Sequence, residues 1–120
     1  MAKKSKRDEL VYIEDILKCI DKLEEYVSDI TEEQFEANSE KQDAVIRRIE
    51  IIGEAAKNIS KETREHYNTI PWKEMAGMRD IVIHQYFGVS SELIWRVATS
   101  EIPELKDTIY KILKDFQEKL

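Results

Sequence analysis

Hydrophobic residues recur at intervals of three and four along most of the 120-residue chain. This spacing places them on one face of an α-helix. It predicts a long amphipathic helix over residues 8–28, a short helical turn around Phe35 and a second long helix over residues 39–59. The first apolar face consists of Leu10, Ile13, Ile16, Leu17, Ile20, Leu23 and Val27, and the second of Val45, Ile49, Ile52, Ala56 and Ile59.

Polar residues mark where these helices begin. Thr31 is followed three positions later by glutamine, and so is Ser39. This is the form of a capping box, in which each of the two side chains bonds the backbone of the other residue. We therefore expect the short turn to be capped by Thr31 and the second long helix by Ser39. Residues 60–69 form a polar connector with about one helical turn.

Proline and glycine delimit the second half of the chain. Pro71 suits the first turn of a third helix, which is expected to run to Phe87 and to end at Gly88. One of the serines at positions 90 and 91 can cap a fourth helix. Pro103 is expected to open a fifth, whose apolar face consists of Leu105, Ile109, Ile112, Leu113 and Phe116.

The predicted elements indicate one all-α domain over residues 1–120, with residues 1–7 as a flexible basic tail. Their short connections predict an up-and-down antiparallel bundle of about four to five helices. Strand-like alternation, internal repeats and linker composition are absent from the sequence. Trp72 and Trp95 are expected in the core or at a dimer interface.

Composition limits the classes of function. Charged residues make up 37% of the chain and its formal net charge is -6, so no global positive field attracts nucleic acid. An RNA substrate would need a local cationic cleft. The single cysteine, Cys19, excludes an internal disulfide and is expected to be a small buried hydrophobe in a reducing compartment. With no apolar run long enough for a membrane span, we expect a cytoplasmic protein.

Candidate chemistry gathers in residues 79–88, where a cation, an imidazole and a phenol stand within eight positions. Arg79 could hold a phosphate bidentately, and His84 could transfer a proton near neutral pH. Tyr86 could stack, donate a hydrogen bond or accept a transferred group. Phosphodiester chemistry without a metal could use this set. The residues alone equally allow a buried core histidine and a surface arginine.

Helical geometry complicates such a site. His84 stands five positions after Arg79, which corresponds to about 140° around a helix. One intact helix cannot direct both side chains at a single phosphate. Either the helix frays just before Gly88, or two copies of the chain share the site, and we expect a shared site.

The pattern Arg-x-x-x-x-His-x-Tyr, formed here by Arg79, His84 and Tyr86, resembles the signature of the HepT-like toxins, a branch of the HEPN superfamily. The resemblance extends over about residues 10–113. Its other landmarks are residues 52–55 (Ile-Gly-Glu-Ala), Pro71 with Trp72, Trp95, and residues 102–105 (Ile-Pro-Glu-Leu).

The resemblance implies an all-α dimer whose two motifs face one cleft, and a metal-independent RNase that needs no cofactor. RNA would be cleaved by attack of the 2′-hydroxyl on the adjacent phosphate. His84 would transfer protons, Arg79 would stabilise the charged phosphorane and Tyr86 would position the substrate. Glu54, which could pair with Arg79 or stand exposed, and Asp80 are possible supporting residues. Candidates to line the cleft are Arg47, Arg48, Lys57, Lys73 and Arg96.

The resemblance also implies a partner. HepT-like toxins are usually paired with a minimal nucleotidyltransferase antitoxin that transfers AMP to the motif tyrosine, here Tyr86. Two alternatives remain open. One is a non-catalytic helical module that binds the nucleotidyltransferase or its nucleotide, which the acidic net charge mildly favours. The other is a purely structural bundle in which His84 belongs to the core.

Overall fold

The computed structural model describes residues 6–84 and 91–119. These residues form helices and turns but no strand, which confirms the all-α prediction. The helices are α1 (Lys6–Val27), α2 (Glu32–Glu36), α3 (Ser39–Lys57), α4 (Lys61–His66), α5 (Trp72–His84), α6 (Ser91–Arg96) and α7 (Lys106–Glu118). A π-helical stretch (Val97–Glu101) and a 3₁₀ turn (Pro103–Leu105) join α6 to α7. The α-helices formed by the described residues outnumber the four to five expected, because the structure adds short helices such as α2 and α4 to the long ones.

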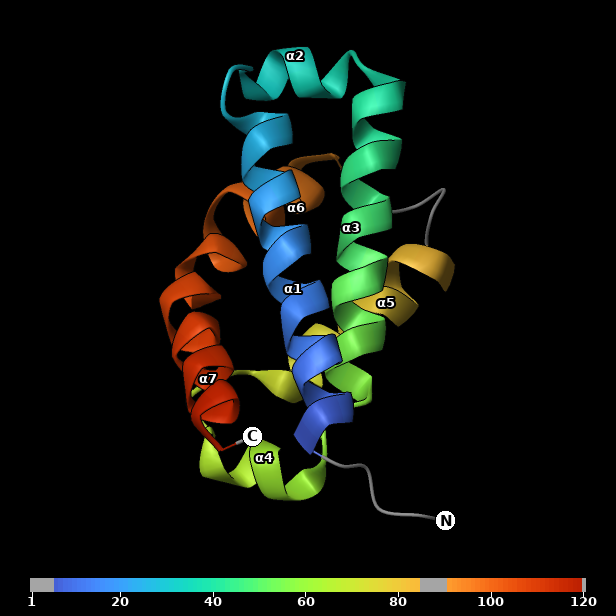
Figure 1. Cartoon of the computed structure of the whole chain (residues 1–120). Coiled ribbons are helices and arrows are strands. Elements are labelled where there is room, and N and C mark those ends of the chain that lie inside the picture. Colours follow the sequence, from blue (N-terminus) through green and yellow to red (C-terminus); the bar gives the residue numbers. More distant parts are fainter. Residues whose placement is uncertain (1–5, 85–90, 120) are drawn as a thin grey trace.

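Helix α1 is the centre of the bundle, with α3 on one side and α7 on the other (Figure 1). Both neighbours run antiparallel to α1, as predicted. Lys106, at the start of α7, bonds Asp21 and Glu24 toward the end of α1 at 2.9 and 3.3 Å. Helix α5 packs on α3, while α2 and α4 lie at opposite ends of the bundle (Figure 1).

The predicted apolar faces meet in one core. Most of their members are buried, and Leu10, Leu17, Val27, Leu105 and Leu113 are partly buried against it. Cys19 is also buried, as predicted. The fully buried side chains include Ile13, Ile16, Ile20, Leu23, Val45, Ile49, Ile52, Ile109 and Ile112. Burial of one such side chain stabilises a fold by about 1.5–3 kcal/mol, so this core is the main source of stability.

One predicted helix cap is confirmed and the other is wrong. Thr31 and Gln34 form the reciprocal capping box at 2.9 and 3.1 Å. At α3 the N-cap is Asn38 instead of Ser39, since the Asn38 Oδ1 accepts a bond from the Lys41 amide at 3.0 Å. The Gln42 side chain does not fold back on Ser39 because it donates to the carbonyls of Phe35 and Glu36, at 2.8 and 2.9 Å.

Glu9 is a buried acidic residue near the start of α1. Its side chain is 4% exposed. One carboxylate oxygen accepts a bond from the Ser60 amide at 2.6 Å, and the other from the Thr63 hydroxyl at 3.1 Å. Ser60 in turn caps α4 through the Thr63 amide. Glu9 therefore fixes α4 against the start of α1.

Both tryptophans pack inside the fold. Trp72 is buried and its indole N–H donates to the Tyr67 carbonyl at 3.1 Å. Trp95 is partly buried, with its ring 5.3 Å from that of Phe35. Pro103 opens a 3₁₀ turn instead of the last helix itself, which begins at Lys106. None of the helices formed by the described residues is long and apolar enough to cross a membrane.

Candidate functional site

Helix α5 carries both Arg79 and His84. It is continuous from Trp72 to His84, so the helical positions of the two residues are about 140° apart. The helix does not break between them. The predicted end of the helix at Phe87 and Gly88, and Tyr86 itself, lie outside the described residues.

The position of Arg79 belongs to the side of α5 that packs on the bundle. Trp72 stands seven residues before it and Met75 four before it, spacings that share one helix face. Both of these side chains are buried. On the helix, the position of Arg79 therefore adjoins those of two buried residues.

The position of His84 belongs to the opposite, outer side. Asp80 stands four residues before it, Gly77 seven before and Lys73 eleven before, all within about 40° around the helix. Lys73 and Asp80 are exposed. We call the line of Lys73, Gly77, Asp80 and His84 the outer stripe of α5.

Helix α3 runs antiparallel beside α5. Ile52 and Ile49 line a small apolar cavity of about 60 Å³ together with Met75 and Met78. Helix α5, which carries Arg79, is thus packed along α3.

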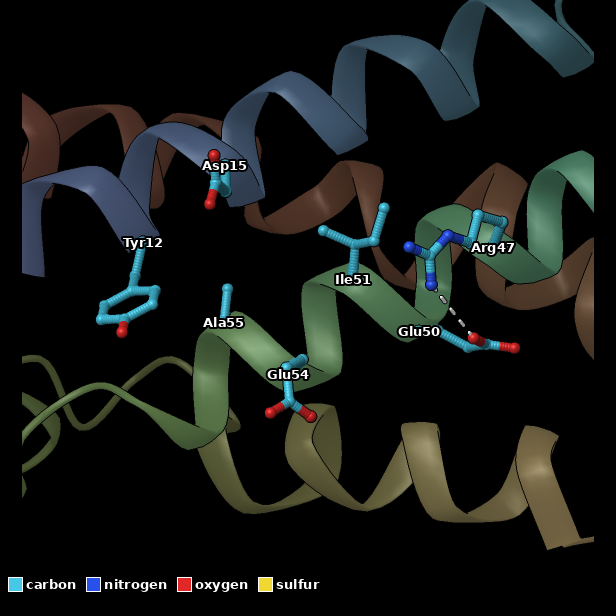
Figure 2. A pocket seen from close by; sticks show the side chains of 7 residues that line it. All are labelled: Tyr12, Asp15, Arg47, Glu50, Ile51, Glu54 and Ala55. Atoms are coloured by element: carbon cyan, nitrogen blue, oxygen red, sulfur yellow. Dashed lines mark ion pairs between the residues drawn. The ribbon is translucent and has the colours of Figure 1, made fainter.

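A charged cleft of about 270 Å³ lies between α1 and α3 (Figure 2). The cleft brings together two residues singled out by the sequence, Glu54 and Arg47, and Arg47 pairs with Glu50 at 3.6 Å. Glu54 extends from the side of α3 on which α5 packs (Figure 2). The cleft is lined by Tyr12, Asp15, Arg47, Glu50, Ile51, Glu54 and Ala55. Sequence reasoning missed Tyr12 and Asp15.

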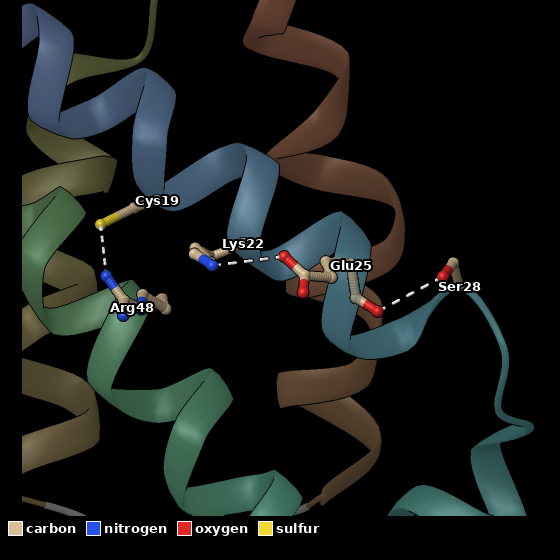
Figure 3. A network of polar contacts seen from close by, with 5 residues as sticks. All are labelled: Cys19, Lys22, Glu25, Ser28 and Arg48. Carbon is tan, nitrogen blue, oxygen red and sulfur yellow. Dashed lines mark hydrogen bonds and ion pairs between the residues drawn. The ribbon is translucent and has the colours of Figure 1, made fainter.

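Arg48, the next candidate, points toward Cys19 of α1 (Figure 3). Its Nη1 lies 4.0 Å from the Sγ of Cys19. Burial raises the pKa of the Cys19 thiol, and the neighbouring guanidinium only partly opposes that effect. Figure 3 also shows the exposed pair of Lys22 and Glu25 at 3.4 Å further along α1. Arg48 thus covers a neutral buried thiol and does not line the charged cleft.

The remaining cation candidates lie elsewhere. Arg96 pairs with Glu101 at 3.2 Å, and Lys57 is exposed at the end of α3. Lys73 lines an open groove of about 550 Å³ where α4 meets α5. We call this the α4–α5 groove; its lining consists of Lys61, Arg64, Glu65, Asn68, Ile70, Pro71, Trp72, Lys73 and Glu74.

Within residues 6–84 and 91–119, no three His, Cys, Asp or Glu side chains lie together as metal ligands would. His66 is exposed and stacks edge-on against Tyr67, with ring centroids 4.6 Å apart. The Tyr67 hydroxyl donates to Asp115 at 2.6 Å, and burial together with this bond raises the pKa of Tyr67 to about 12.

Comparison with known proteins finds a matching family model and several similar proteins. The family model described as ribonuclease HepT-like matches residues 16–112. A Methanocaldococcus jannaschii protein named as a gamma-glutamylcyclotransferase and putative RNase is 53% identical over 110 residues, which are 92% of this chain and 50% of that protein. The chain thus spans half the length of this relative.

Other relatives match along nearly their whole length. A putative RNase of the same organism is 48% identical over 95% of this chain and 98% of its own. A Thermococcus cleftensis protein named probable ribonuclease HepT is 44% identical over 91% of this chain and 99% of its own. No solved structure gives a significant match.

Proposed function

This chain belongs to the HepT-like ribonuclease family, and we propose that it is a metal-independent endoribonuclease and the toxin of a toxin–antitoxin pair. One observation carries the proposal. The Arg and His of the Arg-x-x-x-x-His pattern both stand on the continuous helix α5, and α5 packs on α3, the helix that carries Glu54 in a charged cleft. Relatives that match over nearly their full length are named as RNases, and this supports RNA as the substrate.

The proposed reaction is an internal transesterification of RNA. The 2′-oxygen attacks the adjacent phosphorus, the bond to the 5′-oxygen breaks, and a 2′,3′-cyclic phosphate forms. The 2′-hydroxyl loses a proton and the leaving 5′-oxygen gains one, and imidazole suits this transfer near neutral pH. We assign the proton transfer to His84. A guanidinium stabilises the extra negative charge of the phosphorane, and we assign this role to Arg79.

We further propose that two copies of the chain complete each site. The positions of Arg79 and His84 point about 140° apart on one α5, so they cannot converge on one phosphate from a single chain. In a symmetric dimer, the Arg79 of one protomer and the His84 of its partner can meet across the two-fold axis. Such a dimer would contain two equivalent composite sites.

Supporting roles follow from position. Asp80 stands one helical turn before His84 on the outer stripe, a spacing at which a carboxylate can hydrogen-bond an imidazole and fix its orientation. Glu54 stands on α3, and α5, which carries Arg79, packs on that helix. A carboxylate there can hold a guanidinium in place until the phosphate arrives.

The antitoxin of the proposed pair is a minimal nucleotidyltransferase that transfers AMP to Tyr86. Tyr86 stands two residues after His84. A bulky phosphate bound there would occupy the region meant for the RNA phosphate and would use Arg79 as its counter-charge. Inactivation would then need no change in fold.

The test is cleavage of a defined RNA by purified, unmodified protein in the presence of a chelator. The wild type should leave 2′,3′-cyclic phosphate ends, and a strand with a single 2′-deoxy nucleotide at the cut should resist. Arg79→Ala and His84→Ala should each lose roughly 10²–10⁴-fold in rate. Lys111→Ala, which removes an exposed cation on α7, is the matched control and should keep full activity. Cleavage of a matched DNA strand, or full activity in His84→Ala, would refute the mechanism.

A further inference from the structure

Charge is unevenly distributed along this bundle. Residues 24–43, which form the end of α1, helix α2 and the start of α3, contain eight carboxylates and one lysine. Residues 57–73, which surround α4 at the opposite end, contain four cations and two carboxylates. The two ends lie far apart in Figure 1. The α4 end therefore repels a polyanion less than the α2 end does.

The α4–α5 groove lies at this cationic end. Its lining includes the cations Lys61, Arg64 and Lys73, two glutamates and the amide of Asn68. Lys61 is engaged with Glu65 at 3.9 Å in an exposed and therefore weak pair. Arg64 and Lys73 have no ion-pair partner among the described residues. Two cations in one groove are thus available to an anion from solution.

The groove continues onto the outer stripe of α5, because Lys73 belongs to both. From Lys73 the stripe rises along the helix through Gly77 and Asp80 to His84, a distance of roughly 16 Å at 1.5 Å per residue. Gly77 presents no side chain, and no described atom lies within 4 Å of a Cβ built on it. The surface between the groove and His84 is therefore open at its midpoint.

We propose that the α4–α5 groove and the outer stripe form an RNA-binding track in which Arg64 and Lys73 hold backbone phosphates a few nucleotides from the bond cleaved at His84. The inference rests on the proposed nuclease function and specifies how an acidic protein retains its substrate. Contacts to phosphates carry no sequence information, so the track fixes the register of the strand and leaves base choice to other residues.

The test measures binding of a single-stranded RNA of about 12 nucleotides, a length within the range of single-strand binding sites. The binding host is the His84→Ala protein, so the RNA stays intact. The double variant Arg64→Glu, Lys73→Glu is compared with the control variant Lys111→Glu, Lys119→Glu. The control makes the same change in net charge at two exposed lysines, one within α7 and one at its C-cap. The groove variant should weaken binding roughly tenfold. It should also make the plot of log binding constant against log salt concentration less steep by about 1.4, since each single-strand phosphate contact contributes about 0.7 to that slope. The control variant should stay within about twofold of its host.

Two further measurements separate a track from a structural defect. In the active protein, the groove substitutions should raise KM for the long RNA several-fold more than KM for a dinucleotide, which is too short to reach the groove. Gly77→Phe should likewise raise KM for the long RNA, whereas Gly77→Ala should not. Equal losses in groove and control variants, or no loss in either, would overturn the track.

The results also separate the two proposals. RNA that binds through the groove but is never cleaved by the wild type would refute the nuclease and keep the track. RNA cleaved with a KM that the groove substitutions do not change would refute the track and keep the nuclease.

Discussion

The carboxylate of Glu9 accepts a 2.6 Å hydrogen bond from the backbone amide of Ser60, which lies 51 residues later in the sequence. Its second oxygen accepts from the Thr63 hydroxyl, so the two donors at the start of α4 both depend on one buried side chain from α1. Helix α4 has only six residues and cannot hold its own position. The location of the α4–α5 groove therefore depends on Glu9.

Replacement of Glu9 by leucine should reduce the free energy of unfolding by about 2–4 kcal/mol, because two buried donors lose their charged acceptor. Glu9→Gln keeps one acceptor oxygen, so its free energy of unfolding should fall by less. Chemical denaturation gives both values. Glu14→Leu, at an exposed position of the same helix, is the control and should change stability by about 0.5 kcal/mol or less. A Glu9→Leu protein as stable as this control would contradict the assigned role.

Gly77→Ala should stabilise the protein by about 0.5–1 kcal/mol. A glycine inside a helix is less favourable than alanine, and the added methyl group meets open space. Thermal unfolding gives the shift, and the rate of RNA cleavage should be unchanged. A loss of stability would show that a second copy or another part of the chain occupies the outer stripe.

Alkaline pH should destabilise the fold through Tyr67. Its folded-state pKa is raised to about 12 from a usual value of 10, by burial and by the bond to Asp115. A raised pKa means that the folded state holds the proton more tightly than the unfolded chain. The resulting stability is complete below pH 10 and is lost between pH 10 and about 12.

The matched variant for this effect is Tyr67→Phe, which cannot ionise. It should be less stable at neutral pH by about 1 kcal/mol, since the bond to Asp115 is lost. Its stability should fall less steeply than that of the wild type between pH 10 and 12. Denaturant unfolding at several pH values measures both slopes, and equal slopes would contradict the assignment.

Tyr86→Phe should abolish AMP transfer to the protein by the nucleotidyltransferase without altering its helicity. The phenolic oxygen is the nucleophile of the proposed modification, and phenylalanine lacks it. Intact-mass measurement after incubation with the enzyme and ATP gives the result. Tyr110, another tyrosine that is exposed, is the control position, and Tyr110→Phe should be modified like the wild type. Full modification of Tyr86→Phe would exclude Tyr86 as the acceptor.

The long helices could be predicted closely because their signals are local. The stripe that includes Ile13 and Ile16 located α1 to within two residues, and the spacing of Ile49 and Ile52 located α3 equally well. Features that depend on distant partners were missed. Nothing near Glu9 in the sequence reveals that its hydrogen-bond donors lie beyond position 59. The cap of α3 was misassigned because the Gln42 side chain bonds the backbone of α2 and so does not complete a capping box with Ser39.

The candidate site divides in the same way. The 140° between Arg79 and His84 follows from counting residues along one helix, and α5 has this geometry. That Arg47 and Glu54 share a cleft with Tyr12 depends on how α1 packs on α3. That Arg64 and Lys73 line the same groove depends on how the chain turns between α4 and α5. Neither relationship is encoded in a sequence spacing.

The most direct test of the proposed site is to mix two inactive proteins, Arg79→Ala and His84→Ala, allow their subunits to exchange, and measure RNA cleavage. If each site takes Arg79 from one protomer and His84 from its partner, a mixed dimer contains one intact site. Random exchange of equal amounts should then restore about a quarter of the wild-type activity, since half of the dimers are mixed and each has one working site of two. Mixtures that exchange subunits and stay inactive, while the wild type cleaves RNA, would contradict the shared site.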